Sequence, residues 1–215
     1  MRKVVIVGAG GLGRQVLAQM QIDNDHGIVW VIEGFLDERG PGAVPESLYY
    51  PWLGHPEHFQ PTAQHLFVAA IGDTNSRQQQ IAPLLSKGAE FTSVRTRCNL
   101  GLRTRYGTTF FGYDVSCGVD CRIGNYGYID QQVLIGHDVV IGDYVHIAPR
   151  CLLAGHVTLG NRVTVNPGAM IARGVNIGDD AVIGMGSVVF RDVPAGTTVA
   201  GNPARTIFEN PTVSQ

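Results

Sequence analysis

A histidine followed directly by an aspartate, His137-Asp138, is the side-chain pair in this sequence best suited to acid–base chemistry. An imidazole accepts a proton near neutral pH, and a neighbouring carboxylate orients the ring and raises its basicity. A surface histidine taken alone is usually inert. The pair therefore needs a structural context before it counts as a general base.

A glycine-rich stretch, Gly8-Ala9-Gly10-Gly11-Leu12-Gly13, follows a short apolar segment and precedes a good helix opening. Strand, glycine loop and helix form the context in which such glycines bind phosphate, because free N–H groups at the helix start attract anions. The alternative is a tight turn without a ligand. Asp37 ends the next predicted strand, where it would accept hydrogen bonds from a base or a ribose. Glu33 has the commoner spacing for that role but lies inside the strand.

The element that positions His137 is a stretch in which every sixth residue is aliphatic, here called the hexad lattice. Neither the helical period of 3.6 nor the strand period of 2 produces such a repeat, whereas a coil of short strands does. A β-sandwich with chance spacing is the alternative. Glycine often follows the lattice residue, as a tight corner favours, and His137 lies beyond such a corner on the outer surface. The aliphatic residues of the lattice are Ile123, Ile129, Ile135, Ile141, Ile147, Leu153, Leu159, Val165, Ile171, Ile177, Ile183 and Val189.

The first 95 residues have the pattern of a small α/β domain. We predict strands over 4–7, 29–36, 66–71 and 90–94, helices after the first glycine loop and from about 74 to 86, and an irregular loop over 40–56. Asp73 or Thr74 would cap the second helix. One such domain supplies half of a dinucleotide-binding fold, so a nucleoside diphosphate fits it better than NAD does.

The rest of the chain divides into the coil and its two ends. Residues 96–122 enter the coil, with Phe110-Phe111 covering its open end, and Gly201-Asn202-Pro203-Ala204 terminates it. The predicted domains are 1–95, a Rossmann-like α/β domain, and 96–207, a parallel β-helix, followed by a C-terminal tail over 208–215 whose residues from 210 on are expected to be frayed.

Composition excludes several partners. The 215 residues are 44% hydrophobic and 16% charged with a formal net charge of -2, so no basic excess favours nucleic acid or an anionic membrane. The small cluster Arg95, Arg97, Arg103 and Arg105 is interpreted as a solvated domain junction. We expect no membrane insertion and no signal peptide. The four cysteines lack zinc-site spacing, which favours a reduced, cytoplasmic protein.

Together, the unbroken hexads, the Gly201-Asn202-Pro203-Ala204 ending, the Gly136-His137-Asp138 segment and the glycine-rich front resemble bacterial sugar acyltransferases of the hexapeptide-repeat superfamily. The resemblance covers residues 1 to about 207. It implies a left-handed β-helix behind a nucleotide-sugar domain and a homotrimer with coenzyme A between neighbours. It also implies N-acetylation of a nucleotide-linked amino-sugar, such as a 4-amino-4,6-dideoxy sugar for surface glycans, by acetyl-CoA as cosubstrate. One departure is visible: Arg95-Thr96-Arg97 stands where relatives often carry His-Pro.

The resemblance also implies a role for particular residues. His137 would be the catalytic base, Asp138 its acidic neighbour, and the Gly155 N–H would face the thioester carbonyl, where a donor stabilises the oxyanion. Asp130 would lie near the acceptor amine. Acetyl-CoA would be bound by His146, Gly155, Ala172, Gly184, Asn202 and Pro203. Phosphate would lie at Gly10, Gly11 and Gly13, the nucleoside at Asp37, and the acceptor near Gly72, Asp73, Asn75 and Arg77, although a solvated helix-surface role for Arg77 is as consistent.

Three other functions compete with this prediction. The γ-type carbonic anhydrases share the coil and bind zinc through histidines, for which His137, His146 and His156 are candidates, but their close histidine pair is absent here and we expect no metal. A non-catalytic sugar-nucleotide sensor would be expected to lack His137. O-acetylation of a sialic-acid-type sugar would use the same base, oxyanion site and groove.

Overall fold

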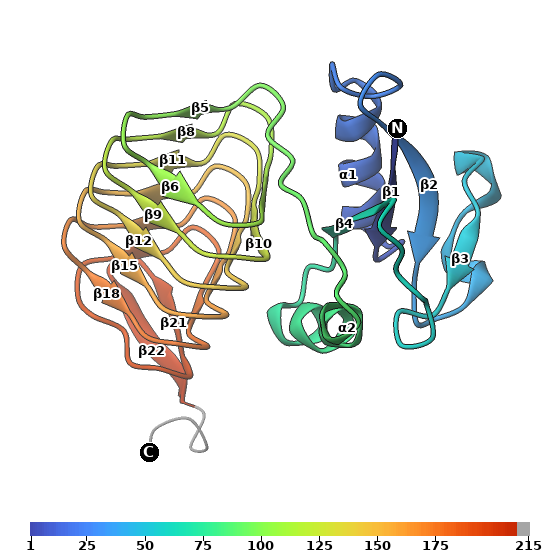
Figure 1. The fold of residues 1–215 in the computed structure, drawn as a ribbon. Helices are drawn as coiled ribbons and strands as arrows, with labels where there is room; N and C mark the ends of the chain where they lie inside the picture. The colour runs from blue at the N-terminus through green and yellow to red at the C-terminus, as the bar shows by residue number, and fades with distance from the viewer. Residues whose placement is uncertain (210–215) are drawn as a thin grey trace. The chain divides into compact units, whose positions relative to one another are not determined.

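The computed structural model describes residues 1–209; residues 210–215 of the expected tail lie outside the described residues. The chain divides into two compact units, Met1–Thr96 (unit 1) and Arg97–Gln215 (unit 2), coloured blue to green and green to red in Figure 1.

Unit 1 is an α/β domain around a parallel four-stranded sheet with the order β3-β2-β1-β4. Val4 to Val7 of the central strand β1 are 0% exposed, as expected for a parallel strand covered on both faces. The elements are β1 (Arg2–Val7), α1 (Gly11–Gln21), β2 (Trp30–Leu36), the 3-10 turns Pro41–Ala43 and Glu46–Leu48, β3 (Trp52–Gly54), β4 (His65–Ala69) and α2 (Thr74–Ser86).

Two predictions for unit 1 need correction. The loop expected over 40–56 contains two 3-10 turns and the edge strand β3, which is too short for a periodic signal. The strand expected over 90–94 is reduced to isolated bridge residues at Phe91 and Val94, of which Phe91 pairs with Phe67. The cap of α2 is confirmed, because Asp73 Oδ1 accepts a hydrogen bond from the Ser76 N–H at 2.7 Å.

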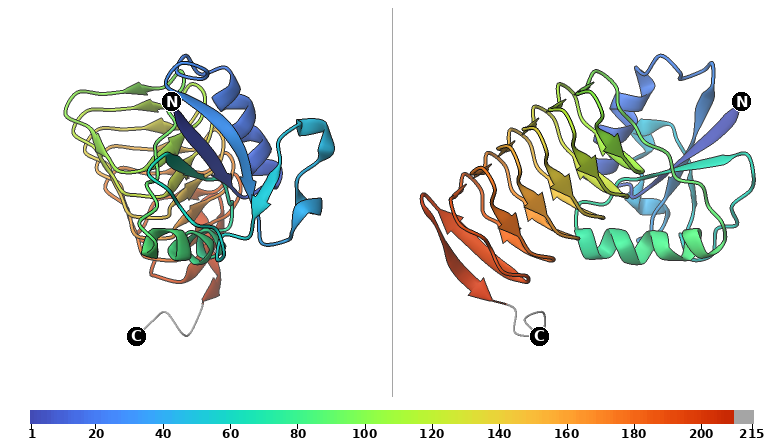
Figure 2. Two further views of the ribbon diagram at one scale, coloured as in Figure 1. Left: turned by 45° about the vertical axis from the view of Figure 1, so that its right-hand side comes forward. Right: turned by 60° about the vertical axis from the view of Figure 1, so that its left-hand side comes forward.

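Unit 2 is a left-handed parallel β-helix whose short strands form three sheets. Each strand from β8 to β21 pairs in parallel with the strand one coil earlier, so the strands stack as successive turns (Figure 2). Sheet B contains β7 (Thr109–Phe111), β10 (Gly127–Ile129), β13 (His146–Ile147), β16 (Thr164–Val165), β19 (Val182–Ile183), β21 (Thr197–Gly201) and β22 (Ala204–Glu209). Sheet C contains β5 (Asn99–Leu100), β8 (Ser116–Cys117), β11 (Leu134–Ile135), β14 (Leu152–Leu153), β17 (Met170–Ile171) and β20 (Val188–Val189). Sheet D contains β6 (Arg105–Tyr106), β9 (Arg122–Ile123), β12 (Val140–Ile141), β15 (Thr158–Leu159) and β18 (Asn176–Ile177).

The hexad lattice fills the interior of the coil, as predicted. Every lattice residue from Ile123 to Val189 is at most 6% exposed. The lattice also extends upstream through Cys117 and Phe111, which are in the same core. Phe110-Phe111 is therefore not a cover over an open end: two earlier strands, β5 and β6, precede it, Phe111 points inward, and the Phe110 ring stacks on Tyr128 with centroids 4.5 Å apart.

The C-terminal end of the coil is a hairpin. Strand β21 pairs with a neighbour of the stack on one side and with β22, antiparallel, on the other. Asn202 and Pro203 form its turn, joined by a cis peptide bond. Residues 208 and 209 belong to β22, so the first two residues of the expected tail are part of this sheet.

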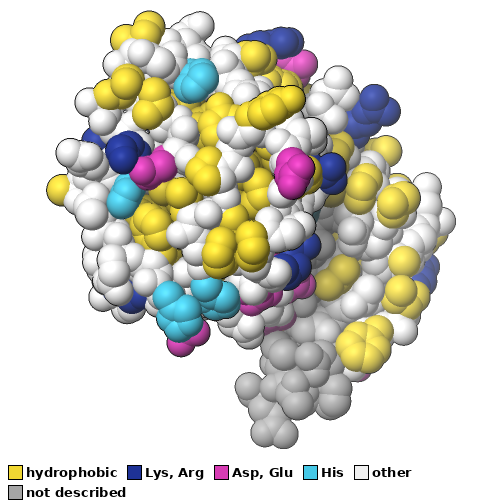
Figure 3. Space-filling view, turned by 90° about the vertical axis from the view of Figure 1, so that its right-hand side faces the viewer, with side chains coloured by type: hydrophobic (Ala, Val, Ile, Leu, Met, Phe, Trp, Pro, Cys, Tyr) yellow, Lys and Arg dark blue, Asp and Glu magenta, His cyan; other side chains and the backbone are white. Residues whose placement is uncertain are grey.

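No helix within residues 1–209 is long and apolar enough to cross a membrane. On the face in Figure 3, basic side chains are dispersed among acidic, polar and apolar ones.

Candidate active site

The His137-Asp138 pair occupies the corner that follows β11, at the edge of sheet C. Asp138 adopts a left-handed backbone (φ +57°), and its N–H donates to Val119 O of the previous coil at 3.0 Å. His137 Nδ1 lies 2.7 Å from Asp138 Oδ2. A carboxylate accepts, so this contact holds the proton on Nδ1 and leaves the lone pair of Nε2 to receive another. Both side chains are nearly half exposed, which leaves the pair open to a substrate.

Directly below, in the next coil, Gly155 and His156 border the same imidazole. A Cβ atom built on Gly155 would lie only 2.7 Å from His137 Nε2, so that nitrogen faces the Gly155 backbone. The His156 ring meets the His137 ring edge-on, with centroids 4.9 Å apart at 88°. His156 Nε2 is 3.9 Å from Asp138 Oδ2. The structure thus brings His137, Asp138 and Gly155 together and adds His156, which the sequence suggested only as a zinc ligand.

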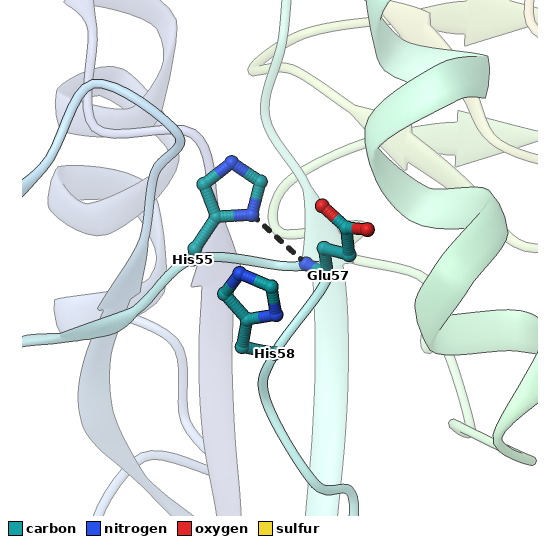
Figure 4. A group of neighbouring side chains, drawn as sticks. All are labelled: His55, Glu57 and His58. Carbon is teal, nitrogen blue, oxygen red and sulfur yellow. Dashed lines mark hydrogen bonds between the residues drawn. The ribbon is translucent and has the colours of Figure 1, made fainter.

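Of the three histidines suggested for a zinc site, His137 and His156 come together in this chain but His146 does not join them. His146 lies on β13 in sheet B, whereas His137 and His156 border sheet C. Among the described residues, the groups with ligand atoms close enough to hold an ion are His137-Asp138-His156 and a second group, His55-Glu57-His58, in unit 1. In the second group, which Figure 4 shows, His55 Nδ1 accepts the Glu57 N–H at 3.1 Å. That bond leaves the proton of a neutral His55 on the outward-facing Nε2, which disfavours metal ligation there.

Asp130 and His146 are positioned by sheet B. Asp130 follows β10, is 8% exposed, and its Oδ1 accepts the Gln131 N–H at 2.7 Å. Burial raises the pKa of Asp130 above its ordinary value, with the backbone bond acting in the opposite direction. The His146 ring stacks on Tyr128, with centroids 5.4 Å apart and planes at 13°.

The coil residues of the predicted site therefore divide between two edges. His137, Gly155 and Ala172 follow strands of sheet C. Asp130, His146, Gly184 and the Asn202-Pro203 turn belong to sheet B. A single chain does not bring these two groups together.

In unit 1, the glycine loop opens into a cavity of about 390 Å³. Helix α1 begins at Gly11, so its first N–H groups lie at this loop. Of the residues predicted to bind substrate, five line the cavity: Gly10, Gly11, Asp37, Gly72 and Asp73.

Asp37 has a different environment from the one predicted. It is 3% exposed, and its Oδ2 accepts the Ala9 N–H of the glycine loop at 2.8 Å. The Arg39 guanidinium donates to both of its oxygens, at 2.8 and 2.7 Å. Burial acts to raise the pKa of Asp37, but the hydrogen bonds from Arg39 and Ala9 outweigh it and hold the pKa below its ordinary value. Its acceptor capacity is largely occupied within the protein, so Asp37 is better suited to fixing the loop than to binding a ribose.

Arg39 is a cationic residue of the cavity lining that the sequence analysis did not predict. Its side chain is 59% exposed while Asp37 holds it, and its Nη2 lies 3.6 Å from the position of a Cβ on Gly10. A guanidinium beside a helix N-terminus suits an oxyanion. The signal was present, since an arginine two residues after a strand-end aspartate can fold back on it, but only the packed loop shows where it points.

Gly13, Asn75 and Arg77 do not line the cavity. A Cβ on Gly13 would lie 2.0 Å from Gly8 O, so Gly13 is required by the close approach of α1 to the loop. Asn75 is exposed on α2. Arg77 is 0% exposed and donates to Ile71 O at 2.8 Å, which corrects both the helix-surface interpretation and the diphosphate contact.

The cysteines are packing residues. All four are free thiols, and three are buried. Burial raises the pKa of Cys117 to about 12 and that of Cys151 to about 11, so neither is a thiolate nucleophile near neutral pH.

Known protein families match both units. The family described as PglD N-terminal domain matches residues 3–84, and the one described as bacterial transferase hexapeptide (six repeats) matches residues 156–191. No curated protein sequence is a significant match.

Solved structures match nearly the whole chain. PerB from Caulobacter crescentus, solved with CoA and GDP-perosamine, is 26% identical over 97% of this chain and 98% of its own, with a TM-score of 0.86. WeeI from Acinetobacter baumannii AYE is 26% identical over 96% of this chain and 100% of its own, with a TM-score of 0.84. The acetyltransferase domain of PglB from Neisseria gonorrhoeae FA1090, solved with acetyl coenzyme A, is 24% identical over 96% of this chain and 99% of its own (TM-score 0.85) and supports the fold.

Proposed function

We propose that this chain, which belongs to the hexapeptide-repeat acyltransferases that carry a PglD-type N-terminal domain, acetylates the amino group of a nucleotide-linked amino-sugar. The donor is acetyl-CoA, and the acceptor is a 4-amino-4,6-dideoxy sugar destined for a surface glycan. The observation that carries this proposal is the His137 Nδ1–Asp138 Oδ2 contact of 2.7 Å, which leaves Nε2 facing Gly155. The CoA and GDP-perosamine bound to the C. crescentus relative support the two substrate classes.

The proposed mechanism is direct transfer. The sugar amine attacks the carbonyl carbon of the thioester while His137 Nε2 takes one of its protons. Asp138 keeps the imidazolium oriented, and the Gly155 N–H donates to the oxyanion of the tetrahedral intermediate. Collapse of the intermediate breaks the C–S bond, and the departing thiolate receives the proton from His137. The buried, protonated Cys117 and Cys151 argue against a covalent acyl-enzyme at these thiols.

A homotrimer would complete the site. Leu134, Leu152, Met170 and Val188 are register partners along the outer face of sheet C, and the first three are 38% to 50% exposed. An apolar column of this kind on a flat sheet suits burial against another subunit. A neighbouring coil would also bring its sheet B edge, with Asp130 and His146, to the His137 corner.

The donor groove would continue toward the C-terminal end of the coil. A cavity of about 460 Å³ there is lined by Pro203 of the hairpin turn and by Arg191 and Arg205, among others. Two cations beside backbone groups suit the phosphates of coenzyme A. The nucleotide of the acceptor would occupy the unit 1 cavity, with its phosphates on Gly10, Gly11 and Arg39. Acetyl-CoA and free thiols both suit the cytoplasm, where we place the reaction.

The test is release of free coenzyme A thiol from acetyl-CoA in the presence of UDP-, dTDP- and GDP-linked 4-amino-sugars and of sialic acids. Turnover with one amino-sugar that falls by about 10² to 10⁴ in His137→Ala would support the proposal. Because His137 is exposed, the variant should keep its thermal stability. Release with a hydroxyl acceptor alone would support O-acetylation, and binding of nucleotide-sugars without release would support a sensor.

A further inference from the structure

His156 occupies the corner directly after Gly155, one coil after the His137–Asp138 corner. Its backbone is left-handed (φ +62°), like that of Asp138 (φ +57°). The His156 N–H donates to the carbonyl oxygen of His137 at 2.9 Å, which ties the two residues together across adjacent coils. The backbone therefore presents the His156 side chain to the proposed base, although the proposed mechanism gives this side chain no role.

The His137 ring is bordered by Asp138, Gly155 and His156. Its Nδ1 lies 2.7 Å from Asp138 Oδ2. The tip of the ring faces Gly155, because a Cβ built there would lie 2.7, 2.9 and 3.1 Å from Nε2, Cε1 and Cδ2. The His156 ring meets the His137 ring at 88° with centroids 4.9 Å apart. His156 is thus the neighbour that packs a side-chain ring against the base.

The contact with Asp138 is a weak restraint on the His137 ring. The two side chains are 45% and 46% exposed. A solvent-exposed pair of this kind shifts a conformational population by about fivefold at most. An edge-on contact between two rings contributes a comparable factor, about 2- to 12-fold. The His156 ring therefore restrains His137 about as strongly as Asp138 does.

The ring of His156, rather than its charge, is the feature that bears on the base. Its Nε2 lies 3.9 Å from Asp138 Oδ2, which is too long for a hydrogen bond. The His156 side chain is as exposed as that of Asp138, so an ion pair between them would be worth little. The ring-to-ring packing remains as the direct contact.

We propose that His156 is a positioning residue for acetyl transfer: its ring limits rotation of the His137 imidazole and keeps Nε2 turned toward Gly155. His156 acts through His137 and takes no proton itself. A base that leaves this orientation is out of reach of the amine, so the rate scales with the fraction of His137 that is held in place. The inference rests on the proposed function, in which His137 is the base.

Two substitutions at His156 separate the ring from the rest of the side chain. His156→Asn removes the ring and suits the left-handed backbone, which asparagine adopts more readily than most residues. His156→Phe keeps a ring without its nitrogens. Tyr126 and Tyr144 show that this backbone accepts aromatic residues, since they occupy left-handed corner positions (φ +57° and +60°) with ring centroids 5.1 Å apart.

Steady-state kinetics should show a loss in kcat without a change in binding. In His156→Asn we expect kcat to fall about 3- to 10-fold, with both KM values unchanged. His156→Phe should keep kcat within about twofold of the wild type. An unchanged kcat in His156→Asn, a raised KM for either substrate, or a phenylalanine variant as slow as the asparagine variant would each overturn the assignment.

Tyr126→Asn is the matched control. It removes a ring that contacts its counterpart one coil later, also from a left-handed position, but at the corner that follows β9 of sheet D. Far-UV circular dichroism should show a similar loss of thermal stability in the two asparagine variants, with kcat reduced in His156→Asn alone. An equal fall in kcat in both would assign the effect of His156 to general stability and overturn the proposal.

NMR of the full chain with isotope-labelled histidine tests the positioning without turnover. The sequence has seven histidines, and the signals of His137 are those that His137→Ala loses. Ring nitrogen shifts distinguish the two neutral tautomers, and the Nδ1–H form of His137 should fall about threefold or more relative to the Nε2–H form in His156→Asn and recover in His156→Phe. An unchanged ratio would refute the positioning role. A changed ratio without any wild-type turnover would refute the proposed function but retain that role.

Discussion

One carboxylate lies at the centre of each candidate binding region: a buried one at the glycine-loop cavity of unit 1 and an exposed one at the His137 corner of unit 2. Asp37 is 3% exposed and bonded by Ala9 and Arg39, whereas the Asp138 side chain is 46% exposed and contacts His137. A buried, saturated carboxylate fixes the backbone around it, and an open one remains available to chemistry. Substitutions in the cavity should therefore affect folding first, and those at the corner should affect turnover first.

The largest expected effect is that of Gly13→Ala on unit 1. The new Cβ would lie 2.0 Å from Gly8 O, a backbone atom that cannot move aside cheaply, so we expect a loss of about 3 kcal/mol or more in unfolding free energy. Both tryptophans, Trp30 and Trp52, lie in unit 1, so the thermal transition of tryptophan fluorescence reports this unit. Gly11→Ala is the control, because only the end of the Arg14 side chain comes within 4 Å, at 3.9 Å. An unaltered thermal transition in Gly13→Ala would contradict the expectation that substitutions at the glycine loop affect folding first.

Gly155→Ala should instead reduce turnover while the fluorescence transition stays in place. The added Cβ would lie 2.7 Å from His137 Nε2, and a side-chain ring can swing away, so the base is displaced rather than the fold. We expect kcat/KM to fall about 10- to 100-fold, as for a misplaced catalytic group. In a His137→Ala background the same substitution should have little further effect. Additive losses in this double-mutant cycle would contradict the steric explanation.

Asp37→Asn tests the buried carboxylate. The substitution weakens the bonds to Ala9 and Arg39, and should lower the stability of unit 1 by about 1–3 kcal/mol at pH 7. Because the pKa of Asp37 lies below its ordinary value of 3.8 in the folded chain, its contribution is complete above pH 3.8 and lost as pH falls through the folded pKa. Denaturant titrations at a series of pH values should show the two proteins converging in acid. A constant difference would show that the charge is not involved.

The smallest expected effect is that of Asp130→Asn, which should raise the free energy of unfolding where the other stability variants lower it. Burial raises the pKa of Asp130, so the folded coil bears a penalty that is absent below 3.8 and grows as pH rises through the raised pKa. Replacing it with a neutral amide, which still accepts from Gln131, should stabilise unit 2 by about 1 kcal/mol at pH 7. Far-UV circular dichroism of thermal unfolding measures this. A less stable variant at pH 7 would contradict the sign, and a simultaneous fall in kcat/KM would support contact with the amine.

The sequence predicted the coil well because its signal is repeated and local. Each lattice residue, such as Ile147, meets the same environment as its neighbours, so a period of six predicts burial along the whole stack. The His137 corner was also accessible, since position relative to Ile135 determines the outward direction. The upstream extension through Phe111 was missed because aromatic and cysteine side chains replace the aliphatic ones.

The unit 1 residues were harder to predict because their roles depend on packing between distant segments. Asp37 and Gly13 occupy the expected motif positions, but only the folded loop shows that one bonds Ala9 and that the other has room for no side chain. Arg77 looked like a surface residue on a helix and is fully buried. Helical periodicity is a poor guide where a helix of 13 residues has several polar residues and an internal proline.

Strands of unit 2 pair with strands about one coil away in the sequence, so strand pairing in the folded coil runs between neighbouring coils. Each strand from β8 to β17 pairs with one strand of the coil before it and one strand of the coil after it. The coils can therefore assemble one after another, and local stability varies along the stack. Strands β5 and β6 of the first coil each have a strand partner on one side alone. We therefore expect this end of the coil to open locally before the central turns do.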